Sequence, residues 1–169
     1  ADFSEVMYEA YGPGGTGLLI CALTDNPNRA ASDVRTVFGK VKGGAKLAES
    51  GSVAFSFTKV GVVVLEAAEG LDEDAVLTAA ADAGAEDAAP ATGGRWRVTA
   101  SPADFGAVRD ALTGAGLTVA ADASGLEYIP NATVALSDED FEAAEGLIEK
   151  LLALDDVDAV YCSGEGVME

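Results

Sequence analysis

Apolar and polar residues in the first third of the chain follow first a strand pattern and then a helical one. Residues 6–11 and 17–23 are largely apolar and flank a Gly-Pro-Gly-Gly turn, which predicts a β-hairpin. Across residues 29–41, apolar side chains recur every three or four positions, as on the buried face of a helix. Residues 53–57 alternate large apolar side chains with small or polar ones, which predicts a half-buried strand.

The middle of the chain has the pattern of a complete small unit. Asp72 opens a helical stretch that Gly84 ends, and Ser101 with Pro102 begins a second helix. The predicted elements are strand 60–66, helix 72–83, strands 85–89 and 95–99, a helix from Ser101 towards Gly114, and strand 117–128. The order of these elements is βαββαβ.

The parts before and after this unit combine into a second βαββαβ order. The predicted elements are strand 17–23, helix 29–41, strand 53–57, strand 133–136, a helix after Ser137 and strand 157–163. We therefore expect an α+β fold of two ferredoxin-like modules, with residues 59–128 inserted into an outer module of residues 1–58 and 129–169. The first and last strands of the outer module are then neighbours, in a register that separates Cys21 from Cys162 and predicts no disulfide.

Charge is unevenly distributed along the chain. Ten basic and 29 acidic residues give a net charge of −19, which repels phosphate backbones over most of the surface. Residues 1–59 hold six basic and six acidic side chains, so the rest of the chain carries the whole excess. We therefore expect any contact with nucleic acid to come through the first third.

The side-chain chemistry argues against an enzyme. The chain has no histidine, which is the usual general base and metal ligand, and both cysteines lie in apolar stretches where inert buried thiols are expected. The acidic runs at 72–74 and 138–140 fit helix starts and lack the spacing of a calcium loop. We expect no catalytic residue, metal, cofactor or small-molecule substrate. No membrane span is expected either, because the longest apolar run, residues 60–68, is too short.

Two short stretches are candidates for binding. The first is an aromatic and glycine-rich turn whose glycines let another backbone approach closely; an ordinary hairpin turn is the competing interpretation. The second concentrates basic side chains that suit RNA phosphates; a solvated helix face is the competing interpretation. The candidate contact residues are Tyr8, Tyr11, Gly12, Gly14 and Gly15 in the first stretch, and Arg29, Arg35, Lys40, Lys42 and Lys46 in the second.

Short motifs follow one another in an ordered series over nearly the whole chain. The motifs are residues 8–15, 23–29, 34–35 with Phe38, 43–44, Leu47, 51–57, 83–87, 129–131, and 154–157 with 160–161. This series resembles the YebC family. Each motif alone is weak, whereas their order and spacing are specific. Ala10 and Ala30 depart from the pattern, since glycine and threonine are more usual at these two positions.

The resemblance implies the middle and C-terminal parts of that family, without its basic helical N-terminal domain. It implies a translational activator that carries no cofactor and binds the ribosome or messenger RNA through residues 8–46. It also implies a chloroplast or mitochondrial location, with the bacterial cytoplasm as the alternative. Two other functions stay open: a non-catalytic interaction subunit of a larger organellar protein complex, and a DNA-binding transcriptional regulator, which the charge of −19 disfavours.

Overall fold

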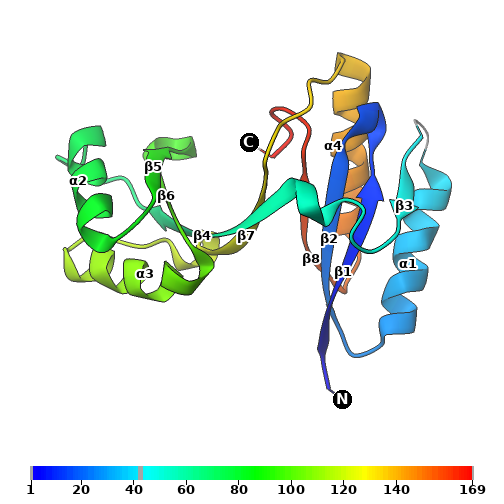
Figure 1. The fold of residues 1–169 in the computed structure, drawn as a ribbon, viewed down its shortest axis with the longest axis horizontal. Coiled ribbons are helices and arrows are strands. Elements are labelled where there is room, and N and C mark those ends of the chain that lie inside the picture. The colour runs from blue at the N-terminus through cyan, green and yellow to red at the C-terminus, as the bar shows by residue number, and fades with distance from the viewer. Residues whose placement is uncertain (1, 42–43, 169) are drawn as a thin grey trace. The chain divides into compact units, whose positions relative to one another are not determined.

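The computed structural model describes residues 2–41 and 44–168, which form two compact units (Figure 1). The outer unit comprises Ala1–Thr58 and Ile129–Glu169, and the inserted unit comprises Lys59–Tyr128. Two strands, β4 (Phe57–Leu65) and β7 (Gly125–Pro130), carry the chain into the inserted unit and back. That each unit is an independently folding domain stays a prediction.

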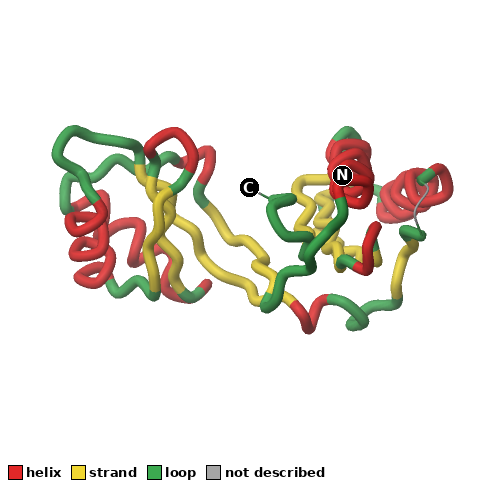
Figure 2. Tube along the Cα trace, turned by 90° about the horizontal axis from the view of Figure 1, so that it is seen from above, coloured by secondary structure: helices red, strands yellow, loops and turns green. Residues whose placement is uncertain are grey.

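The outer unit is a four-stranded sheet with two helices on one side (Figure 2). Its elements are β1 (Ser4–Tyr11), β2 (Gly17–Thr24), α1 (Pro27–Lys40), β3 (Lys46–Ala48), α4 (Asp138–Leu152) and β8 (Val157–Cys162), in the strand order β3-β1-β2-β8. Strands β1 and β2 form the predicted antiparallel hairpin. Alternate strand residues such as Ile20 pack against Val34 of α1 and Leu147 of α4, which places the core between the sheet and the helices.

The inserted unit has the βαββαβ order that its sequence predicts. Its elements are β4, α2 (Glu73–Ala83), β5 (Asp87–Pro90), β6 (Trp96–Ala100), α3 (Phe105–Gly114) and β7, in the sheet order β5-β6-β4-β7. Leu65 of β4 packs in one core with Val76 of α2 and Leu112 of α3. The α+β class is therefore confirmed, with two four-stranded sheets and four α-helices among the described residues.

The helices begin and end at side chains that suit their termini. Asn26, Asp72 and Ser137 each accept a hydrogen bond from the backbone N–H three residues further on. Helix α2 ends at Gly84, whose φ of 87° favours glycine. Gly43, which belongs to one of the short motifs of the sequence, lies outside the described residues.

Three strand predictions fail where the backbone groups bond elsewhere. Residues 53–57 are not one strand, because Ala54–Ser56 is a 3-10 turn whose N–H groups partly bond to a side-chain carboxylate. Residues 133–136 contribute a single bridge, from Val134 to Gly164, and β1 fills the inner sheet position expected for them. Residues 117–128 are interrupted by a second 3-10 turn, so β7 begins only at Gly125.

Candidate functional site

The glycine-rich turn between β1 and β2 packs against its own unit. Gly14 has a φ of 72°, and a Cβ added there would lie 2.5 Å from Cδ2 of Leu136. A Cβ on Gly12 would collide with Leu18, whereas one on Gly15 would meet nothing within 4 Å. The left-handed backbone of Gly14 and the close neighbours of Gly12 and Gly14 favour glycine at both positions, which supports the hairpin interpretation of this segment.

The two candidate tyrosines of β1 point to opposite faces of the outer sheet. Tyr8 lies on the helix side, half-buried against the core, and burial raises the pKa of its phenol. Tyr11 is three positions further along the strand and so faces away from α1 and α4, where it is 39% exposed. We term this side the open face. Lys46 of β3 is the cross-strand partner of Tyr11, so an aromatic ring and an exposed ammonium share the open face.

Arg29 is bound by two aspartates and braces the outer unit. Its guanidinium donates two hydrogen bonds to Asp156, at 3.0 and 3.1 Å, and one to Asp25 at 2.8 Å. These bonds join the start of α1 to the residue before β8, and the hydrogen bonds from Arg29 lower the pKa of Asp156. With these donors engaged, Arg29 is less available to an RNA phosphate than the sequence alone suggested.

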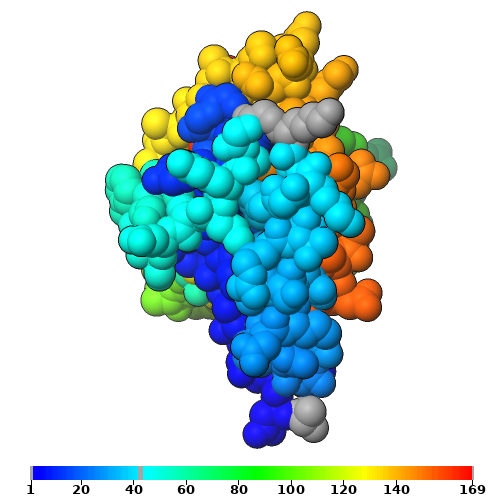
Figure 3. Space-filling view, turned by 90° about the vertical axis from the view of Figure 1, so that its right-hand side faces the viewer, coloured from blue at the N-terminus to red at the C-terminus, as the bar shows by residue number. Residues whose placement is uncertain are grey.

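Three other basic residues of the candidate set have no carboxylate partner among the described residues. Arg35 and Lys40 are exposed on α1, whose outer surface is open along its length (Figure 3), and Lys46 is exposed on β3. The inserted unit differs, because its arginines pair as Arg95–Glu66, Arg97–Glu127 and Arg109–Asp110. Lys42 lies outside the described residues. Arg35, Lys40 and Lys46 form the cationic set.

Both units are acidic once the chain is folded. The outer unit contains six basic and 17 acidic residues, and the inserted unit contains four and 12. The first third is neutral as a segment, but residues 129–169 bring 11 acidic side chains and one basic one into the same unit. Six of these acids belong to α4, on the helix side of the sheet. The sheet therefore separates the open face from the most acidic helix of the unit.

A buried carboxylate that the sequence analysis missed fixes the segment after β3. Glu9 is only 4% exposed and accepts hydrogen bonds from the N–H groups of Gly51 at 2.6 Å, Val53 at 2.8 Å and Ala54 at 2.6 Å. Burial acts to raise the pKa of Glu9, but the three donated hydrogen bonds outweigh it and hold the pKa below its usual value. The segment is thereby tied to the open face of β1, since Glu9 and Tyr11 share that face.

The tip of that segment is an exposed phenylalanine. Phe55 is 77% exposed, more than any other large hydrophobic side chain among the described residues, while Val53 and Phe57 on either side are buried. Asn131 binds the other side of the turn: its N–H donates to the carbonyl of Ser56 at 2.8 Å, and its side-chain amide donates to the carbonyl of Phe55 at 3.3 Å. The 3-10 turn thus rotates Phe55 away from the face that the alternation predicted for it.

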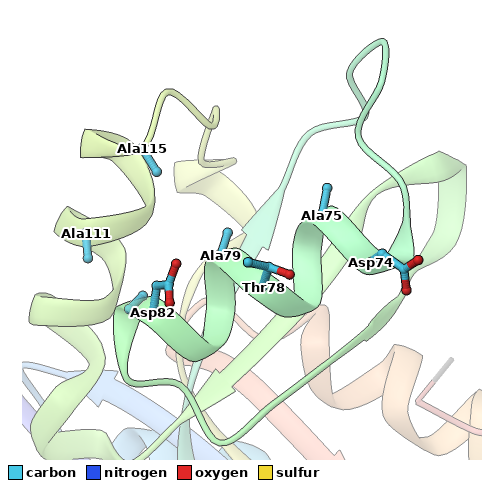
Figure 4. A pocket seen from close by; sticks show the side chains of 8 residues that line it. Asp74, Ala75, Thr78, Ala79, Asp82, Ala111 and Ala115 are labelled. Carbon is cyan, nitrogen blue, oxygen red and sulfur yellow. The ribbon is translucent and has the colours of Figure 1, made fainter.

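The hollows of the surface bring together few groups that suit catalysis. A groove between α2 and α3 is lined mainly by alanines, with Asp74, Thr78 and Asp82 beside them (Figure 4). Burial raises the pKa of the Cys162 thiol, so its sulfur stays protonated at neutral pH. Within residues 2–41 and 44–168, no three His, Cys, Asp or Glu side chains are grouped to hold a metal ion. None of the helices described there is long and apolar enough to cross a bilayer.

The fold and these features define a two-unit α+β protein with exposed candidate contact surfaces on its outer unit. Residues 3–163 match the family described as "TACO1/YebC second and third domain", and the chain belongs to this family. The resemblance inferred from the short motifs is therefore confirmed.

Several bacterial relatives bear the name of a regulator. A "Probable transcriptional regulatory protein" of Caldanaerobacter subterraneus subsp. tengcongensis is 40% identical over 161 residues, which is 95% of this chain and 64% of that protein. Proteins of the same name from Paenarthrobacter aurescens and Corynebacterium aurimucosum are 42% and 44% identical, over 97% and 95% of this chain and 63% and 62% of theirs.

A solved structure shares the fold. The crystal structure of a conserved hypothetical protein from Aquifex aeolicus superposes with a TM-score of 0.85 at 32% identity, over 96% of this chain and 65% of that one. The chain thus spans less than two thirds of the length of each of these four proteins.

Proposed function

We propose that this chain is a translational regulator that binds the ribosome or messenger RNA through its outer unit. The observation that carries the proposal is the cationic set, which stands exposed and without a carboxylate partner among the described residues, in a chain of net charge −19. Basic side chains without a carboxylate partner in the protein are available to pair with an external anion. The phosphate backbone of RNA is an anion that exposed Arg and Lys side chains suit.

The contacts of the basic residues support a narrower set for the proposed contact. Arg35 and Lys40 lie on one helix and Lys46 lies on β3, so the set spans two elements of the outer unit. Arg29 is left out because its donors already hold Asp25 and Asp156. Reversing the charge of Arg29 would therefore disturb the fold as well as any RNA contact.

Ribosome co-sedimentation tests the proposal. The triple variant Arg35→Glu, Lys40→Glu, Lys46→Glu is expected to lose most of its ribosome association at low salt, because reversed charges repel phosphates. A matched triple of exposed residues, Lys59→Glu, Arg109→Glu and Lys150→Glu, changes the net charge equally and is expected to pellet like the wild type. Equal behaviour of the two triples would show that the cationic set is not the contact.

Transcriptional regulation is a second candidate, favoured by the names of the bacterial relatives. The net charge of −19 opposes binding to a duplex, whose phosphates are denser than those of a single strand. Binding to a labelled DNA duplex and to a single-stranded RNA of equal length separates the two functions. Tighter binding to the duplex would favour transcription.

A non-catalytic interaction subunit is the third candidate. Met7 and Leu23 are exposed on the open face, where apolar side chains suit a protein partner. Recovery of the native protein at fixed stoichiometry in a complex without ribosomal RNA would favour this function.

The relatives named above are bacterial, which favours the bacterial cytoplasm over a chloroplast or mitochondrion as the proposed place of action.

A further inference from the structure

We infer that Phe55 is a stacking platform for one unpaired base of single-stranded RNA. The inference rests on the proposed function and deepens it, because it names the side chain and the chemical group that meet. A single exposed apolar side chain is common on protein surfaces and is no site by itself. Phe55 is distinguished by the bonds that hold its turn and by the side chains on the face to which the turn is tied.

The turn that carries Phe55 is fixed from both sides by polar groups. The N–H groups of Val53 and Ala54 donate to the Glu9 carboxylate, and the carbonyls of Phe55 and Ser56 accept hydrogen bonds from Asn131. A buried carboxylate is unfavourable unless hydrogen bonds satisfy it, and here those bonds hold the turn with the most exposed large apolar side chain described. Holding the backbone before binding removes an ordering cost that a flexible loop would meet on binding.

An aromatic ring and a cation share the face to which this turn is tied. Tyr11 lies two residues from Glu9 on the same side of β1, and Lys46 is the cross-strand partner of Tyr11. Glu9 in turn bonds the N–H of Ala54, the residue before Phe55. Aromatic rings and ammonium groups are the side chains by which proteins hold single strands, the rings by stacking on bases and the cations by pairing with phosphate.

The surroundings favour a nucleic acid over a protein partner at this position. The side chains of Ser56 and Asn131 bond to backbone carbonyls of the turn, and Val53 and Phe57 are buried, so no other exposed large apolar side chain is adjacent to Phe55 in the chain. The sheet separates the open face from the acids of α4. Glu49 is the exposed acid of the same segment, and the carboxylate of Glu9 is already bonded to three donors.

Fluorescence anisotropy with a labelled single-stranded RNA of about 12 nucleotides, a length that one binding module covers, tests the inference. Phe55→Ala is expected to raise the Kd roughly 5- to 150-fold, which corresponds to the loss of one stacked base. Phe55→Trp is expected to bind at least as tightly as the wild type. Phe3→Ala is the matched control, since Phe3 is also exposed, at 63%, and is expected to leave the Kd unchanged.

A spectroscopic variant reports stacking directly. The chain has one tryptophan, Trp96, so the double variant Phe55→Trp, Trp96→Phe carries a single indole at the proposed platform. Its fluorescence is expected to be quenched when the RNA binds, because a stacked base quenches the indole. A melting curve of Phe55→Ala that matches the wild type is the control for folding, since the side chain is exposed.

The outcomes separate this inference from the proposed function. An unchanged Kd for Phe55→Ala overturns the stacking role, even where charge reversal of the cationic set still removes the protein from ribosomes. Weaker ribosome pelleting of Phe55→Ala with unchanged RNA affinity also overturns it and indicates a protein contact. A wild-type chain that binds neither RNA nor ribosomes overturns both proposals.

Discussion

The outer and inserted units share one architecture but differ in how their polar and charged side chains are buried and paired. Each has a four-stranded sheet and two α-helices among the described residues. The polar or charged residues that are buried all lie in the outer unit, within the described ranges: Glu9, Thr16, Thr24, Asp156 and Ser163. The arginines of the inserted unit pair with carboxylates, whereas Arg35 of the outer unit does not. The outer unit thus has loops held by hydrogen bonds to buried polar groups as well as basic side chains without a carboxylate partner. We therefore expect contact with a partner in this unit.

The largest expected effect separates the stabilities of the two units. Glu9→Ala leaves three N–H groups without their acceptor and is expected to lower the free energy of unfolding of the outer unit by about 3 kcal/mol. Trp96 lies in the inserted unit, so its fluorescence during urea unfolding follows that unit, while far-UV circular dichroism follows both. The circular dichroism transition is expected to shift and the Trp96 transition to stay. Exposed Glu49→Ala is the control, and a parallel shift of both signals contradicts independent units.

A smaller effect is expected in the turn between β1 and β2. Gly14→Ala forces a left-handed backbone on alanine and brings its Cβ within 2.5 Å of Leu136, so we expect a loss of about 2 kcal/mol or more. Gly15→Ala carries the same backbone strain without a neighbour within 4 Å, and about 1 kcal/mol is expected. Urea midpoints from circular dichroism give both values. Equal losses would mean that Leu136 moves aside.

Acid is expected to act on the outer unit through Glu9 and Asp156, whose pKa values lie below their usual values in the folded chain. A lowered folded pKa contributes stability above the unfolded value, about 4.3 for Glu and 3.9 for Asp, and this contribution is lost as the pH falls towards the folded pKa. Stability of the outer unit should therefore decrease below about pH 4.5. In Glu9→Gln the decrease between about pH 5 and 3 is expected to be shallower. An unaltered pH dependence in this variant would rule out Glu9 as the titrating group.

The smallest effect concerns the salt dependence of RNA binding. One phosphate contact on a single strand contributes about 0.7 to the slope of log affinity against log salt concentration. Lys46→Gln is expected to reduce that slope by about 0.7, and Lys150→Gln on α4 is expected to leave it unchanged. Anisotropy titrations at several salt concentrations measure both slopes. Equal slopes for the two variants would remove Lys46 from the contact.

Local features of the fold follow from the sequence because their causes are local. The β1–β2 hairpin depends on a short turn, and the helix starts at Asn26, Asp72 and Ser137 depend on caps three residues away. The turn at Phe55 escapes the same reasoning because the carboxylate that holds it is 42 to 45 residues distant. Its alternating pattern therefore predicted a strand that the structure does not contain.

The candidate contact residues divide in the same way. Basic residues that cluster in a polar segment are expected to be exposed, and this holds for Arg35, Lys40 and Lys46. One of the two aspartate partners of Arg29, Asp156, lies 127 residues away, so nothing near Arg29 in the chain indicates this second aspartate. Folding also places the acids of α4 in the same unit, so the neutrality of the first third does not extend to the outer unit.

The pairing of β2 with β8 has a consequence for synthesis of the chain. The inserted unit is one continuous stretch, so we expect it to complete its sheet once Pro130 has emerged from the ribosome. The sheet of the outer unit stays incomplete until β8 is synthesised, more than 100 residues after β2. At typical elongation rates this interval is on the order of ten seconds. During that interval the hairpin presents an unpaired β2 edge that is prone to aggregate. A nascent chain arrested just after the inserted unit is therefore the state in which we expect chaperones to matter most.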